Sequence, residues 1–398
     1  MAVGSSAMTG RAVGCARFYQ EIVDAAPIGF GPLQLDTVYC LELPRGSFAM
    51  SPPVPSPDGK GYFTYEGARG LWIGSLAPGT KPQRIVGGLT RESIDYDGVL
   101  PFAWASDSGS ILGVTQKTAA PSGLSLAPLV AQRFALSGPP QPLPRFQYEA
   151  GGLDGILWTG GDGRAVAVLG TGGSDYRPRH SDPHPTIALI DARAGRALQT
   201  VELTNLNLPI KARITNLDAG VDRDGRIQAL LDFGGNSWFL WIQGQMPRAV
   251  TLAVKPGRAR LRLSPDGETV LVSHELSGAV TYCEFNPRCP PPVLETGAIA
   301  ELHNLKDGKV RWRINWTGAG FSPDPPAISP DGRYALINVP AGRDGVKGIA
   351  LVSMRDGSIL DRIKSPSLSY KQATGFGRDS KTLWVSGASR VATYRIND

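Results

Sequence analysis

The sequence predicts an all-β protein, a seven-bladed β-propeller of four-stranded antiparallel blades that is closed by a strand from the N-terminal region. Two repeated signals support this fold: a turn tetrapeptide with its degenerate copies, and a second hairpin that follows it in phase. The composition agrees, because 49 glycines and 33 prolines make up about a fifth of 398 residues. No segment keeps a 3.6-residue apolar period, so we expect few helices.

The first signal is the tetrapeptide Ser-Pro-Asp-Gly, which occurs at Ser56–Gly59, Ser264–Gly267 and Ser329–Gly332. Each copy precedes a short apolar run typical of a strand. Proline fixes φ, aspartate accepts hydrogen bonds from the amides of its own turn, and glycine adopts the positive φ that closes it. Each copy therefore predicts a β-hairpin.

Degenerate copies of this turn fill the gaps between the three perfect ones. One aspartate marks each turn: Asp58, Asp107, Asp162, Asp224, Asp266, Asp331 and Asp379. Successive markers lie about 40 to 65 residues apart, near the period of a four-stranded blade with loops of variable length. Seven markers predict seven blades.

A second hairpin follows most of these turns. It is clearest at Ile187–Gly195, Ile299–Gly308 and Ile349–Gly357, where an apolar strand and a turn lead into another strand. Two hairpins in tandem supply strands a, b, c and d of one blade.

Ring closure and the domain boundary follow from the two ends of the chain. The last blade begins near Gln372 and supplies only strands a to c, so we expect its fourth strand from Leu35–Leu43. Such pairing removes both free edges of the ring. We predict a mobile tail over residues 1–30 and a single propeller over residues 31–398.

The Ser-Pro-Asp-Gly hairpins resemble the propeller repeats of the TolB and prolyl oligopeptidase type and of YVTN lactonase-like proteins. The resemblance spans residues 35–398 and implies the fold, which many unrelated activities share. Prolyl oligopeptidases add a hydrolase domain with a G-x-S-x-G elbow, and this sequence has no such pentapeptide. The Gly-His and Trp-Asp dipeptides of the tryptophan–aspartate subclass are absent too.

Loop lengths predict where function lies. The b–c and d–a loops share one propeller face, and long b–c loops are expected at Gln116–Gln132, Thr171–Pro185, Glu275–Gly297 and Val339–Gly348. Ordering a long loop costs entropy, so several on one face favour a binding surface over neutral insertion.

The richest loop is Thr171–Pro185. With the loops of blades 5 and 6 it supplies the predicted ligand- or partner-binding residues: Asp175, Tyr176, Arg177, Arg179, His180, Asp182, His184, Arg288, Arg343 and Lys347. Paired arginines suit a carboxylate or phosphate. A metal site at His180, Asp182 and His184 is a weaker alternative, because no distant third ligand is identifiable. A simple solvated loop is the third interpretation.

The remaining histidines and the cysteines carry weaker signals. His274 and His303 lie on predicted strands, where we expect packing or structural hydrogen bonds. Cys283 and Cys289 lie close together, and they are either a disulfide of an oxidising compartment or two reduced thiols. The bridge would place the protein in the periplasm or outside the cell. Without it, and with no apparent signal segment, we expect the cytoplasm.

These observations predict a non-catalytic binding or scaffold propeller that engages a protein, a peptide or a small anionic ligand through the b–c loop face. No cofactor is predicted, because phosphate-binding and catalytic motifs are absent. The net charge of +6 is spread along the chain, which argues against nucleic acid, and no apolar stretch is long enough for a membrane span. The alternatives are an enzyme of the lactonase or lyase type and the propeller part of a hydrolase assembly.

Overall fold

In the computed structural model of the chain, nearly all the regular structure of the described residues is β-strand. None of the described helical segments is long and apolar enough to cross a membrane. The structure describes residues 10–15, 24–28, 31–42, 51–66, 70–86, 102–105, 108–116, 129–135, 141–142, 153–159, 164–169, 186–191, 196–202, 216–222, 224–233, 238–252, 254, 259–276, 294–318, 325–341, 347–364, 372–387 and 389–397.

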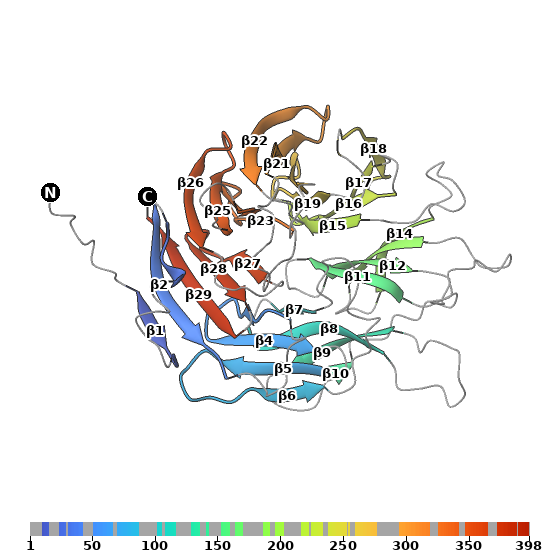
Figure 1. Cartoon of the computed structure of the whole chain (residues 1–398). Coiled ribbons are helices and arrows are strands. Elements are labelled where there is room, and N and C mark those ends of the chain that lie inside the picture. The colour runs from blue at the N-terminus through green and yellow to red at the C-terminus, as the bar shows by residue number, and fades with distance from the viewer. Residues whose placement is uncertain are drawn as a thin grey trace, which may run out of the picture.

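Seven antiparallel blades form a ring, and each blade follows the order a, b, c, d from the centre outward (Figure 1). Blade 1 consists of β3 (Val54–Pro55), β4 (Gly61–Glu66), β5 (Gly70–Ser75) and β6 (Gln83–Val86). Blade 2 consists of β7 (Phe102–Trp104), β8 (Ser110–Gln116), β9 (Leu129–Ala135) and β10 (Gln141–Pro142). Blade 3 consists of β11 (Leu153–Thr159), β12 (Arg164–Leu169), β13 (Thr186–Asp191) and β14 (Arg196–Glu202). Blade 4 consists of β15 (Asn216–Val221), β16 (Ile227–Asp232), β17 (Trp238–Ile242) and β18 (Arg248–Val250). Blade 5 consists of β19 (Ala259–Leu263), β20 (Thr269–His274), β21 (Glu295–Asn304) and β22 (Val310–Gly318). Blade 6 consists of β23 (Ala327–Ile328), β24 (Tyr334–Val339), β25 (Gly348–Ser353) and β26 (Ile359–Lys364).

The seventh blade closes the ring with both ends of the chain. Its strands a to c are β27 (Gln372–Phe376), β28 (Thr382–Gly387) and β29 (Arg390–Ile396), and β2 (Leu33–Cys40) pairs antiparallel with β29 as the fourth strand. Figure 1 shows blue β2 beside red β29. The predicted closure is confirmed, although the strand lies two to three residues earlier in the sequence than expected.

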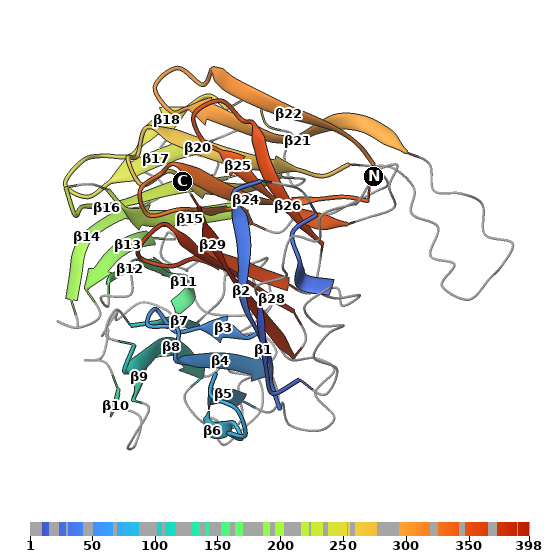
Figure 2. The same ribbon diagram turned by 90° about the vertical axis from the view of Figure 1, so that its left-hand side faces the viewer.

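The residues before β2 differ from the expected tail. A fifth strand, β1 (Arg11–Val13), pairs parallel with β2 (Figure 2), and a disulfide joins Cys15 to Cys40 across a Cα–Cα distance of 5.0 Å. The Tyr394 hydroxyl also donates a 2.8 Å hydrogen bond to the carbonyl of Ala25, which is buried. Residues 10–15 and 24–28 therefore contact the closing blade.

The three Ser-Pro-Asp-Gly turns have the same hydrogen-bonding pattern. The serine hydroxyl donates to the aspartate carboxylate at 2.5 to 2.6 Å and accepts the amide that opens strand b at 2.8 to 3.0 Å. The glycine that follows has φ between +68° and +73° in all three turns. The turn chemistry therefore fixes where strand a ends and strand b begins, and all seven marker positions fall between strands a and b.

The hydrophobic core lies between blades. Leu271, Trp312 and Ile314 of blade 5 pack against Ile337 and Val352 of blade 6. Comparable clusters join blades 1 and 2, 3 and 4, 4 and 5, and 6 and 7. Buried tryptophans at 104, 238, 241 and 312 belong to these clusters and contribute to the packing between blades. Apolar side chains pack the blades against one another. Residues that could bind a ligand are therefore sought in the loops and among the polar groups at the interfaces between blades.

Candidate functional site

Long b–c connections are anchored on one face of the ring. Strand b runs in the same direction in every blade, so each b–c connection starts and ends on the same side. The gaps from Gln116 to Leu129, Leu169 to Thr186 and His274 to Glu295 are long, whereas blade 1 needs only residues 67–69. The opposite face carries the short a–b and c–d turns. The ring is therefore asymmetric in loop length.

Most residues that the sequence predicts for this face lie outside the described part of the chain. This holds for Asp175, Tyr176, Arg177, Arg179, His180, Asp182, His184, Arg288 and Arg343, and for Cys283 and Cys289. Lys347 is described: it is exposed and directly precedes β25 on the b–c side. The blade 5 loop is shorter than predicted, because β21 already begins at Glu295.

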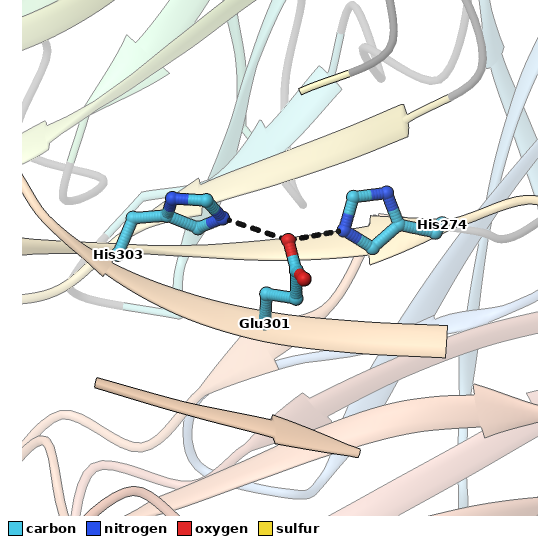
Figure 3. Close-up of side chains that lie close together, drawn as sticks. All are labelled: His274, Glu301 and His303. Atoms are coloured by element: carbon cyan, nitrogen blue, oxygen red, sulfur yellow. Dashed lines mark hydrogen bonds and ion pairs between the residues drawn. The ribbon is translucent and has the colours of Figure 1, made fainter. Parts of the chain in front are cut away.

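A polar cluster that the sequence did not predict as a site lies in blade 5. His274 ends strand β20, while Glu301 and His303 lie on the paired strand β21 (Figure 3). Val272 pairs with Glu301 and Val270 with His303, so these side chains share one face of the sheet. The two valines pack against Trp238, Leu240 and Val250 of blade 4. The cluster therefore sits at the interface between blades 4 and 5.

One carboxylate oxygen is the centre of this cluster. Nε2 of His274 and Nε2 of His303 each lie 3.0 Å from Oε2 of Glu301. The guanidinium of Arg313, on β22, donates to the other oxygen, Oε1, at 2.5 Å. The side chain of His303 is fully buried, those of Glu301 and His274 are 5% and 14% exposed, and that of Arg313 is 53% exposed. The cluster thus reaches solvent at both His274 and Arg313.

The neighbours of Glu301 favour the ionised form of its carboxyl group. Burial raises the pKa of its carboxyl, but hydrogen bonds from His274, His303 and Arg313 outweigh burial and hold the pKa well below its usual range. The imidazole of His303 also contacts a second acceptor: its Nδ1 lies 3.3 Å from the carbonyl oxygen of Gly308 in the c–d turn. Both ring nitrogens of His303 consequently face hydrogen-bond acceptors.

The sequence assigned structural roles to His274 and His303 and did not single out Glu301 or Arg313. One local signal was present: Glu301-Leu-His303 places two polar side chains on the same face of a strand, directly after the apolar residues Ile299 and Ala300. His274 could not be joined to them from sequence, because residues 275–294 separate it from β21.

A second polar contact joins the first strands of blades 4 and 5 to the segment that precedes the first strand of blade 6. Arg262 of β19 donates to the Asp218 carboxylate of β15 at 2.9 Å and to the carbonyl of Pro326, before β23, at 3.1 Å. The amide of Leu263 donates to the same carboxylate at 2.6 Å. Burial raises the Asp218 pKa more than Arg262 and this amide lower it. These partners give the pair a structural role in joining inner strands.

A polar hollow of about 510 Å³ lies on the closing blade, outside the channel. Its lining comes from β1, β2 and β29 and includes Arg11, Asp36, Tyr39 and Arg395. Arg395 lies 3.4 Å from Asp36, so opposite charges are paired in its wall.

Comparison with known proteins adds information about the fold. No family model matches the chain, and no curated protein sequence matches it significantly. Among solved structures, a chain of one titled "Crystal Structure of Mitotic Checkpoint Complex" is similar over 94% of this chain and 95% of its own, with a TM-score of 0.52 and 10% identity. The similarity is one of fold. At this identity it assigns no activity, and the predicted TolB and lactonase-like resemblance gains no support from it.

Proposed function

We propose that this chain is a non-catalytic binding or scaffold propeller that engages a protein or peptide partner, or a small anionic ligand, through its b–c loop face. The observation that carries the proposal is the asymmetry of the ring. Long connections of blades 2, 3 and 5 are anchored on the b–c side, while the other side consists of short turns whose polar groups bond to one another.

The structural neighbour supports this direction in a general way. It is part of a complex by its title, and 95% of its chain matches this ring. Propellers commonly present loops to partners while the blades stay rigid. Lys347 adds an exposed positive charge on the proposed face. Arg177 and Arg179 of the blade 3 loop are the proposed contacts for a carboxylate or phosphate group.

The test starts by finding a partner with the purified chain as bait and then measuring its affinity. Arg177→Ala with Arg179→Ala should weaken binding at least about tenfold without changing the melting temperature, since substitutions in loops away from the core usually change stability little. A matched double variant on the opposite face, Lys306→Ala with Arg355→Ala, replaces two exposed cations in c–d turns. The proposal is wrong if this control loses binding while the loop variant binds normally.

A further inference from the structure

We propose that His274, Glu301 and His303 form a binding site for a divalent transition-metal ion of the zinc class. Two imidazoles and a carboxylate are the donors that such ions take from proteins. The three donor atoms lie within 4.8 Å of one another, and both histidine nitrogens are 3.0 Å from Oε2 of Glu301. Neighbouring ligands of an ion held at about 2.1 Å are separated by about 3 Å at right angles and somewhat more in a tetrahedron. Figure 3 shows both rings pointing at the same oxygen atom.

The hydrogen bonds of His303 give an independent reason for a cation. Nδ1 faces the carbonyl oxygen of Gly308 at 3.3 Å, and Nε2 faces Oε2 of Glu301 at 3.0 Å. A neutral imidazole carries a single N–H, so it cannot donate to both acceptors. If Nδ1 donates to the carbonyl, a cation must lie between Nε2 and Oε2, either a second proton or a metal ion. A backbone carbonyl on the far nitrogen is the usual partner of a metal-bound histidine.

The surroundings hold the donors in place. Arg313 binds Oε1 of Glu301 and leaves Oε2 directed at the two rings. Glu301 and His303 lie in the second half of β21, and both are paired to β20 on one side and to β22 on the other. A metal site requires ligands on rigid elements. It also requires that the oxygen or nitrogen atom of each ligand that does not face the metal has a hydrogen-bond partner.

Access is available from the b–c end. His274 is the last residue of β20 and 14% of its side chain is exposed, so the proposed site meets solvent at this donor. Three protein ligands leave a further coordination position for water. The proposal does not depend on the partner-binding function, because it concerns a blade interface and not the loops.

The chain has four histidines, so the two proposed ligands and the other two histidines can be tested in separate variants. The full-length protein is stripped with chelator and titrated with Zn²⁺ and with Co²⁺, by calorimetry and by visible absorption. His274→Ala removes the most exposed donor, and we expect zinc affinity to fall by more than about tenfold. His180→Ala with His184→Ala removes the other two histidines and should leave the affinity unchanged. Zinc binding that survives His274→Ala but not the loop variant overturns the proposal, as does the absence of binding to the wild-type chain.

A second measurement does not depend on any variant that must fold. In ¹⁵N-histidine-labelled wild-type protein, zinc should shift the Nε2 resonances of the His274 and His303 rings without quenching either resonance. Co²⁺ should give the visible absorption bands of a nitrogen-ligated ion. Rings that carry protons on both nitrogens and do not respond to zinc would show that a proton holds the cluster, which overturns the metal site.

Discussion

The backbone N–H of Asp331 donates a 3.0 Å hydrogen bond to the hydroxyl of Ser380, and so links the a–b turn of blade 6 to that of blade 7. Blades 1 and 2 repeat the arrangement, because the N–H of Asp58 donates to the hydroxyl of Ser108 at 3.1 Å. Both serines have a positive φ, +57° and +56°, at the position where the perfect turns have glycine. The left-handed backbone is unfavourable for serine, so the link between blades offsets its strain.

The first prediction separates the link at Ser380 from its strain. Ser380→Ala keeps the unfavourable φ and leaves the Asp331 N–H without its acceptor, so we expect a loss of about 1 to 2 kcal/mol in the free energy of unfolding. Ser380→Gly loses the same bond but relieves the strain, and should stay within about 0.5 kcal/mol of the wild type. Denaturant unfolding of both variants measures this difference. Equal stability of the two variants would contradict the argument.

The second prediction concerns pH and Asp331. Burial raises the pKa of this carboxyl, but hydrogen bonds from Ser329 and Arg333 outweigh burial and lower the pKa below 3.8. A carboxyl with a lowered folded-state pKa stabilises the fold fully above its unfolded pKa, and this contribution is lost as the pH falls through the folded value. Asp331→Asn should therefore lower stability by about 1 kcal/mol at pH 7 and flatten the loss of stability below about pH 4. Unfolding curves from pH 7 to pH 2 test it, and parallel curves for the two proteins would refute it.

The third prediction concerns ring closure. Deleting residues 1–45 removes β1 and β2, which uncovers Val385, Ala392 and Tyr394 of the closing blade. We expect cooperative unfolding to be lost or the melting temperature to fall by more than about 10 °C.

Two shorter deletions grade the effect. Deletion of residues 1–9 keeps β1, Cys15 and Ala25, and for the N-terminal tail that the sequence predicts we expect little change in the melting temperature. Deletion of residues 1–25 also removes β1, Cys15 and the Ala25 carbonyl that accepts the Tyr394 hydroxyl, and should be intermediate. If the deletion of residues 1–45 melts like the intact chain, the ring does not depend on β2.

The fourth prediction concerns the disulfide. Cys15 and Cys40 close a loop with a sequence separation of 25 residues, for which chain entropy gives about 3 kcal/mol. Cys15→Ser with Cys40→Ser should lower the free energy of unfolding by about this amount, and reductant should lower that of the wild type equally. The double variant is the control, because reductant should leave it unchanged. Mass spectrometry without reductant checks the bridge directly, and it also tests the predicted pair Cys283–Cys289.

Sequence reasoning worked where the structure depends on short-range chemistry. A serine, an aspartate and a glycine within four residues make their own turn, so Ser56–Gly59 and its copies could be recognised and counted without tertiary information. The closing strand followed from the same count, since the last blade lacked one strand. The binding-loop residues, such as Arg177 and Arg179, remain predictions.

The amino-acid sequence alone established the repeat: seven turns, a second hairpin after most of them, and an incomplete last blade that needs a strand from the other end. Tertiary structure decided the features that join distant residues. It placed β1 on β2, paired Cys15 with Cys40, and brought His274 to Glu301 across the blade 5 loop. The physical reason is range. A turn is stabilised by neighbours in sequence, whereas these contacts depend on which strands the closed ring sets side by side.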